Sequence, residues 1–130
     1  MRILDTSVCV GWLTGKDLGV KRHLASLERD EVSLCSVVKA ELLYGARAST
    51  RVRENLEKLE TLFSLFPSFP FDDEAAEQYG ALRAQLKRAG TPIGGNDMLI
   101  ASIALSVDAT LVTRNEKEFR LVPGLRVEVW

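Results

Sequence analysis

Short apolar runs alternate along the chain with longer segments of helical periodicity. The apolar runs predict short strands at residues 2–5, 32–35, 110–113 and 126–129, with a further extended piece at 68–71. Apolar residues that recur every three or four positions predict helices at residues 6–13, 18–29, 37–44, 50–66, 73–89 and 96–105. Strands that alternate with helices are typical of an α/β sandwich in which helices flank a central, mostly parallel sheet.

Residues that favour caps and turns mark the ends of these helices. Expected N-caps are Thr6 or Ser7 for the first helix, Ser36 for the third, Asp72 for the fifth, and Asn96 or Thr91 for the sixth. Gly15 and Gly90 are expected to end the first and fifth helices. The polar residues 114–120 predict a loop or turn before the last strand.

The helix predicted at residues 50–66 carries an apolar stripe along one face. The stripe consists of Val52, Leu56, Leu59, Leu62, Phe63 and Phe66. Such a stripe must be covered by other apolar groups. Packing in the core, a partner protein and a second copy of the chain are all open as the covering surface.

Composition narrows the class of protein. The chain has 130 residues with 17 basic and 18 acidic side chains and a net charge of −1, which predicts one soluble domain over residues 1–130 without a basic coat for nucleic acid. No apolar run is long enough to span a membrane. An acid at position 5 interrupts any signal-peptide pattern, so a cytoplasmic location is expected. A local nucleic-acid site remains compatible with this balance.

The cysteine and histidine content limits the chemistry. Cys9 and Cys35 lie in apolar surroundings and are expected to be buried, reduced thiols. His23 is the only histidine and lies in a polar stretch, so it is expected to be a solvated helix residue. Catalysis by a pair of histidines, or by a relay that needs an anchored histidine, is therefore disfavoured.

Four acids lie at predicted element ends or beside apolar residues, where solubility does not explain them. Asp5 ends the first strand, Glu41 lies among apolar helix residues, Asp97 lies in a first helical turn, and Glu118 follows the strand at 110–113. Each alone could be structural: a helix-terminal, surface or loop charge. Together at one end of a sheet they would repel one another unless a hard divalent cation bound them. Oxygen ligands without histidine or cysteine favour Mg²⁺, with Mn²⁺ as a substitute.

The chain resembles PIN-domain ribonucleases of the VapC toxin type over its whole length. The segments that carry the resemblance are residues 3–7, 39–45, 93–101 and 111–125, in this order. The resemblance implies a three-layer PIN-like sandwich and an acidic triad of Asp5, Glu41 and Asp97, with Asp5 and Asp97 as direct Mg²⁺ ligands. It departs from the family at Asn115, where many members have aspartate. The fourth acidic role therefore passes to Glu118, with Thr6, Thr113 and Asn115 in supporting positions.

The resemblance also implies an activity and partners. It implies an endoribonuclease toxin of a type II toxin–antitoxin module. Such an enzyme cleaves RNA with metal-activated water and thereby inhibits translation, and tRNA is the expected substrate. Arg114 and Lys117 are candidate contacts to the RNA backbone because they share a loop with Glu118. A VapB-type antitoxin that places a basic side chain among the acids, and a homodimer, are the expected protein partners.

Other functions are weaker fits. A haloacid-type phosphatase needs a second aspartate where Ser7 stands, a receiver domain needs a lysine after a late strand, and a phosphate-binding loop needs glycines after the first strand. An RNA-processing nuclease that is not a toxin, and a PIN-like binding partner with weak or no hydrolysis, remain as alternatives. An intact acidic triad argues against the second, because a scaffold has no reason to gather unpaired acids.

Overall fold

Five parallel strands form one sheet in the computed structural model, which describes residues 1–130. The strands are β1 (Arg2–Leu4), β2 (Val32–Cys35), β3 (Ser68–Phe69), β4 (Thr110–Val112) and β5 (Arg126–Glu128). Their order is β3-β2-β1-β4-β5, and Ile3 of β1 lies opposite Ser33 of β2 and Leu111 of β4. The prediction of an α/β sandwich is confirmed, and the sheet is parallel throughout.

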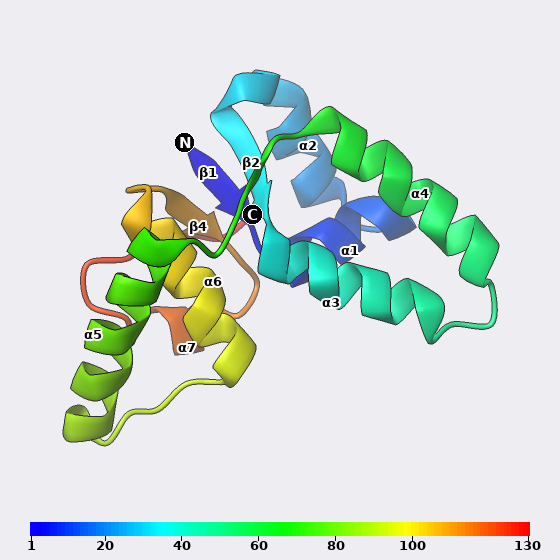
Figure 1. Ribbon diagram of the computed structural model, residues 1–130. Coiled ribbons are helices and arrows are strands. Elements are labelled where there is room, and N and C mark those ends of the chain that lie inside the picture. The colour runs from blue at the N-terminus through cyan, green and yellow to red at the C-terminus, as the bar shows by residue number, and fades with distance from the viewer.

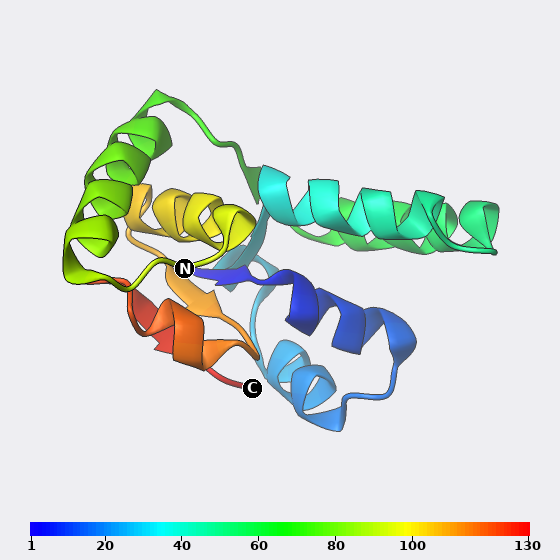
Figure 2. The ribbon, with the colours of Figure 1, turned by 90° about the horizontal axis from the view of Figure 1, so that it is seen from below.

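Helices cover both faces of this sheet. They are α1 (Thr6–Thr14), α2 (Leu18–Ser26), α3 (Ser36–Arg47), α4 (Val52–Leu65), α5 (Asp73–Ala89), α6 (Gly95–Ser106) and the short α7 (Glu116–Phe119). Figures 1 and 2 show α5 and α6 on one side of the sheet and α1 and α2 on the other, while α3 and α4 extend away as an antiparallel pair. No helix is both long and apolar enough to cross a membrane.

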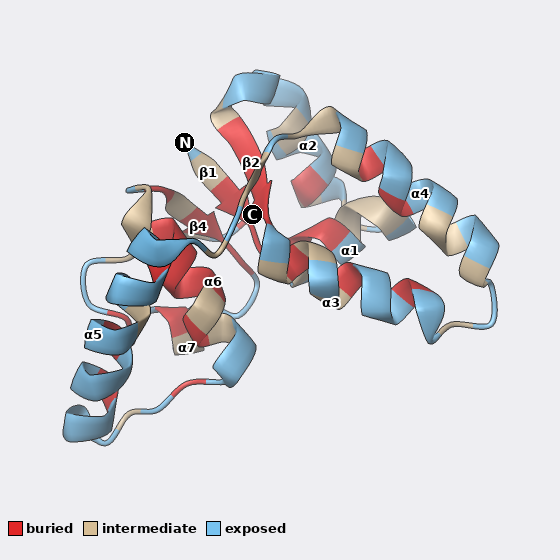
Figure 3. Cartoon of the chain, viewed as in Figure 1, coloured by how far each residue is buried: buried red, intermediate tan, exposed pale blue.

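The core lies between the sheet and the helices on both of its faces. It contains 28 buried apolar residues in one cluster, and the buried positions concentrate on the strands and on α6 (Figure 3). Residues 100–104 of α6 are all buried, so this helix is packed on most of its sides. Burial fixes the direction of α6 and therefore the place of its first turn, which carries Asp97.

The apolar stripe of the fourth helix is mostly a packing surface. Leu59 and Leu62 are buried, whereas Leu56, Phe63 and Phe66 are partly exposed and pack against the core. The stripe covers α3, which lies beside α4 in both views (Figures 1 and 2). The covering surface is thus chiefly another part of the same chain.

Several predicted helix ends were wrong. Asp5 rather than Thr6 or Ser7 caps α1, and its carboxylate accepts from the Thr6 amide. The helix expected over 18–29 stops at Ser26, because a 3₁₀ turn at Arg29–Glu31 leads into β2. Gly94 rather than Asn96 or Thr91 precedes α6, and residues 114–120 include α7. Ser36 is the first residue of α3 and not its cap.

Strand order creates a natural binding site at one end of β1. The chain moves from β1 outward through β2 to β3, then returns to place β4 on the other side of β1. In open parallel sheets a crevice opens at the carboxyl ends of the strands where the direction of winding reverses. Asp5 follows β1 and Thr113 follows β4, so both residues lie at this position.

Candidate metal-binding active site

Asp5 is the centre of a hydrogen-bond network between β1, α1 and β4. It is only 5% exposed. One carboxylate oxygen accepts from the Thr6 amide at 2.8 Å, and the other from the Thr113 hydroxyl at 2.6 Å and the Ser7 hydroxyl at 3.4 Å. Burial nevertheless raises the pKa of Asp5, with a further increase from the charge of Glu41. The donors only partly compensate for the lost hydration of the carboxylate.

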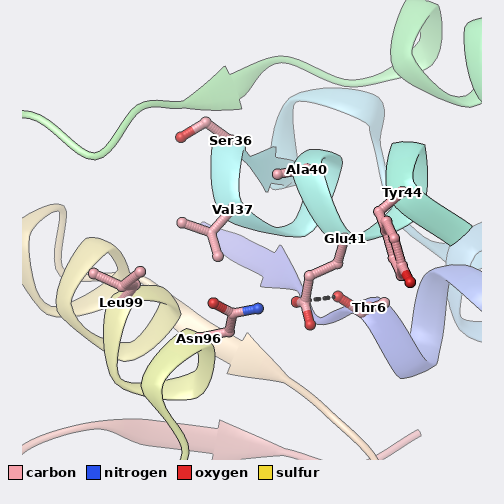
Figure 4. Close-up of a pocket in the computed structure, with 8 residues that line it drawn as sticks. All are labelled: Thr6, Ser36, Val37, Ala40, Glu41, Tyr44, Asn96 and Leu99. Carbon is pink, nitrogen blue, oxygen red and sulfur yellow. Dashed lines mark hydrogen bonds between the residues drawn. The ribbon is translucent and has the colours of Figure 1, made fainter.

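Glu41 reaches the same end of the sheet from α3. Its Oε1 accepts a hydrogen bond of 2.8 Å from the Thr6 hydroxyl (Figure 4). Glu41 and Thr6 both line an open cavity between α3 and α6, where Asn96 lies on the opposite wall. The partly buried position agrees with the expectation that this helix residue faces inward.

Asp97 and Glu118 form a second acidic group, which Asn115 connects. The Asn115 side-chain amide donates to Glu118 Oε2 at 2.7 Å and to Asp97 Oδ2 at 3.3 Å. The other Glu118 oxygen accepts from the backbone amide of Gly94, directly before α6. An aspartate at position 115 could not donate to two carboxylates, so the asparagine reduces repulsion between them.

Asn115 also links this group to Asp5. Its backbone amide donates to the Thr113 hydroxyl at 2.9 Å, and that hydroxyl donates to Asp5. One loop after β4 therefore determines how three of the four acids lie relative to one another. The supporting positions expected for Thr6, Thr113 and Asn115 all contact acids of this site.

The electrostatics of Asp97 reflect its acidic surroundings. Burial, followed by the hydrogen bond and charge of Glu118 and then the charges of Asp5 and Glu41, raises the pKa of Asp97 to about 7. The pKa of Glu118 is lowered, chiefly by the Gly94 amide. None of the four acids forms a salt bridge with a basic side chain. The site thus gathers negative charge that the protein itself does not neutralise.

The donor chemistry fits a hard divalent cation, but the carboxylates are not closed around one point. No group of three or more His, Cys, Asp or Glu side chains stands ready to hold a metal ion. The assignment of Asp5, Glu41 and Asp97 as metal ligands stays a prediction. Like charges separate, and Glu41 and Glu118 instead face the donors Thr6 and Gly94. Uncompensated oxygen ligands remain the set that Mg²⁺ or Mn²⁺ prefers.

Ser7 and Asp17 support the site in ways that the sequence did not predict. The Ser7 hydroxyl donates to Asp5 and accepts from the Arg114 amide at 3.2 Å, so it ties α1 to the loop that carries Asn115. Asp17 caps α2 and forms a salt bridge with Arg114. The contact between Ser7 and Asp5 had one signal in the sequence, a serine two residues after an aspartate that ends a strand.

The basic residues, cysteines and histidine considered in the sequence analysis lie outside the group of four acids. Arg114 is engaged with Asp17, whereas Lys117 is exposed and forms no salt bridge. Both cysteines are buried and unpaired, as expected, and burial raises the pKa of the Cys35 thiol to about 11. His23 is an exposed residue of α2, as expected, and its ring stacks on Trp130 with centroids 5.0 Å apart.

Comparison with known proteins decides the family. The model of the PIN domain matches residues 2–125. The chain belongs to the PIN-domain family. It is 37% identical to Ribonuclease VapC2 of Rickettsia felis and 34% identical to the tRNA(fMet)-specific endonuclease VapC of Salmonella typhimurium. Each alignment covers 98% of this chain and 96% of the relative.

Solved structures give the same assignment. The toxin–antitoxin complex VapBC2 from Rickettsia felis, bound to a promoter DNA fragment, contains a chain that matches with a TM-score of 0.93, 36% identity and 99% coverage of this chain and 98% of that chain. DNA-bound VapBC from Salmonella typhimurium matches with a TM-score of 0.94, 34% identity and coverage of 99% and 97%. The VapC-type PIN fold and the ribonuclease class expected from the motifs are confirmed. PIN-domain ribonucleases of this type generally depend on a divalent metal ion.

The Thr113 hydroxyl should matter for both stability and activity of this PIN domain. Thr113→Val removes the 2.6 Å bond to the buried Asp5 and the acceptor of the Asn115 backbone amide, without a change in shape. We expect unfolding in urea to become easier by about 1–3 kcal/mol and RNA cleavage to fall about 10- to 100-fold. Thr110→Val is the matched control on β4, since that hydroxyl contacts only the exposed Arg126. Equal effects of the two substitutions would contradict a specific role for Thr113.

Proposed function

We propose that this chain is a Mg²⁺-dependent endoribonuclease toxin of a type II toxin–antitoxin module. Residues 1–130 form its single PIN domain, which hydrolyses phosphodiester bonds in RNA and thereby inhibits translation. The observation that carries the proposal is the group of four acids, Asp5, Glu41, Asp97 and Glu118, at the carboxyl ends of β1 and β4 without a basic partner. Repulsion within such a group favours binding of a divalent cation.

Asp5 and Asp97 are the proposed direct metal ligands, with Glu41 as a third. Asp5 is held by three donors and Asp97 is fixed by the buried helix α6, so both carboxylates have defined positions. Mn²⁺ is expected to replace Mg²⁺, because both prefer oxygen ligands. A bound divalent ion supplies a water of lowered pKa and neutralises charge on the phosphate.

Thr6 and Asn115 position the other carboxylates of the site. Thr6 donates to Glu41 Oε1 and so holds this carboxylate in place, with Glu41 Oε2 as the oxygen that would bind the metal ion. Asn115 restrains the Asp97 and Glu118 carboxylates and leaves Glu118 at the edge of the site, as a fourth acid. Attack by water rather than by the 2′-hydroxyl of RNA leaves a 5′-phosphate and a 3′-hydroxyl.

Transfer RNA is the proposed substrate. Two similar proteins are named tRNA(fMet)-specific endonucleases, and they are 34% and 36% identical to this chain. The test is to incubate the protein and Mg²⁺ with total cellular RNA and to sequence the new ends. We expect the ends to map to tRNA, with initiator tRNA among the targets. Cleavage confined to ribosomal RNA would reject this substrate while leaving the nuclease assignment intact.

A small VapB-type antitoxin is the proposed protein partner, alongside a homodimer of this chain. Solved complexes of similar chains with antitoxins support the first proposal. A second groove, of about 450 Å³, lies between α1, α3 and α4 and reaches Glu41 from the side opposite α6. Its walls include Val10, Leu13 and Leu59, which suit an apolar segment of the partner. A basic side chain of the antitoxin would then block the site by pairing with its unneutralised acids.

Lys117 should contribute to RNA binding through the phosphate backbone. It is exposed, unpaired and one residue before Glu118, so Lys117→Glu places a negative charge beside the substrate path. We expect kcat/KM to fall several-fold at low salt, and the slope of log kcat/KM against log salt concentration to decrease by about one. Lys21→Glu on α2 is the control for the same charge change away from the site. An unchanged slope would remove Lys117 from the RNA path.

A further inference from the structure

The cavity between α3 and α6 has an apolar wall that the chemistry of the acids does not use. Its volume is about 780 Å³, within the range of ligand-binding pockets. Glu41 lies at its edge, while Val37, Ala40 and Leu99 supply apolar surface and Asn96 supplies an amide (Figure 4). A substrate whose phosphate lies at the acids can therefore place a neighbouring group along this wall.

Tyr44 is the unusual residue of this cavity. It is 75% exposed, more than any other large apolar side chain of the protein. On the buried side of α3, Val38, Leu42 and Ala46 form the packing face, so Tyr44 contributes little to the core. Tyr44 lies three residues after Glu41, and Val37 lies four residues before Glu41 on α3. This helical spacing places the Tyr44 ring on the same face of α3 as Glu41.

We propose that this cavity is a nucleobase subsite in which the Tyr44 ring stacks on the base next to the scissile phosphate. The proposal rests on the proposed ribonuclease activity and specifies how that site holds its substrate. Single-stranded RNA is commonly bound by stacking of splayed bases on exposed aromatic rings. Asn96, across the cavity on α6, can donate to and accept from the edge of such a base.

The charge of the cavity favours a base over a second phosphate. Glu41 is the only charged residue among those that line it, and no lysine or arginine is present there. A phosphate would meet a carboxylate without a cation, whereas the neutral face of a base meets apolar carbon and an aromatic ring. The apolar groove at α1 and α4, by contrast, carries Lys58 and larger aliphatic surface and suits the protein partner better.

The test compares Tyr44→Ala with the conservative Tyr44→Phe on a short RNA cut by the wild-type protein. The same RNA is also made with a single abasic nucleotide on either side of the cleaved bond. KM is measured by cleavage, and Kd is measured by fluorescence anisotropy on an Asp97→Asn background, which needs no turnover. Leu18→Ala, an exposed truncation at the start of α2, is the matched control.

We expect Tyr44→Ala to raise KM and Kd about 5- to 150-fold on the intact RNA, the range that base–aromatic stacking gives. Tyr44→Phe should restore most of the affinity. On the RNA that lacks the stacked base, Tyr44→Ala should cause no further loss. Such non-additivity shows that the ring and the base contact each other.

Three results would overturn the subsite. The first is an unchanged KM and Kd for Tyr44→Ala, and the second is an equal loss on the intact RNA and on both abasic RNAs. The third is a change in sedimentation mass with unchanged RNA affinity, which would make Tyr44 a contact between protein chains. If the wild-type protein cuts no RNA, the proposed function fails, but the Kd values on the Asp97→Asn background still decide whether Tyr44 stacks on a base.

Discussion

Asp97→Asn is expected to lower RNA cleavage by at least about 10³-fold, a loss of about 4 kcal/mol of transition-state stabilisation. The substitution keeps the shape of the side chain but removes a carboxylate oxygen, the proposed metal ligand, from the first turn of α6. The measurement is the single-turnover rate on RNA with saturating Mg²⁺. Asp73→Asn, which removes an exposed acid from the corresponding turn of α5, should leave the rate unchanged.

The same substitution should make the metal-free protein more stable near neutral pH. The folded-state pKa of Asp97, about 7, lies above its ordinary value of 3.8, so the folded protein holds this proton more tightly than the unfolded chain does. Stability of the wild-type protein therefore falls as the pH rises from about 4 to about 7. Asp97→Asn removes the contribution of this side chain to the decrease in the free energy of unfolding. That contribution is about 1 kcal/mol after solvent screening of a half-exposed group. A variant that is both inactive and unfolded would not support the ligand role.

Removal of divalent metal is expected to abolish cleavage completely. In excess EDTA the four acids have no cation to bring them together, and Glu41 and Glu118 remain turned toward Thr6 and Gly94. Addition of Mg²⁺ or Mn²⁺ should restore activity and raise the Tm, because a ligand that binds only the folded state stabilises it. Asp97→Asn should show a much smaller rise in Tm. Full cleavage in EDTA would exclude the metal-dependent assignment.

Elements with local chemical signals could be predicted from the sequence with accurate ends. Asp72 caps α5 with a bond to Ala75, and Gly90 ends it in the left-handed conformation, as expected from the residue types. The start of α3 was less predictable, because the residue before this helix is Cys35, whose side chain makes no capping hydrogen bond. The early end of α2 depends on the 3₁₀ turn that leads into β2, a tertiary requirement that periodicity does not report.

The acids of the site could be identified from the sequence, but not their arrangement. The end of a strand and the first turn of a buried helix marked Asp5 and Asp97 as unusual positions. The double role of Asn115, as a link between two carboxylates and to Thr113, depends on contacts between β4 and α6 that no spacing reveals. For the same reason the sequence did not predict that Glu41 and Glu118 accept from the separate donors Thr6 and Gly94.

The chemistry of the cut ends tests the central claim most directly. A labelled RNA is prepared with a single 2′-deoxynucleotide immediately 5′ of the bond that the wild-type protein cleaves, and the products are analysed by mass spectrometry. Hydrolysis by water at the Asp5–Asp97 site predicts cleavage at a rate within a few-fold of the unmodified RNA, with a 5′-phosphate and a 3′-hydroxyl. Loss of cleavage at the modified position, together with a 2′,3′-cyclic phosphate from the unmodified RNA, would contradict the account.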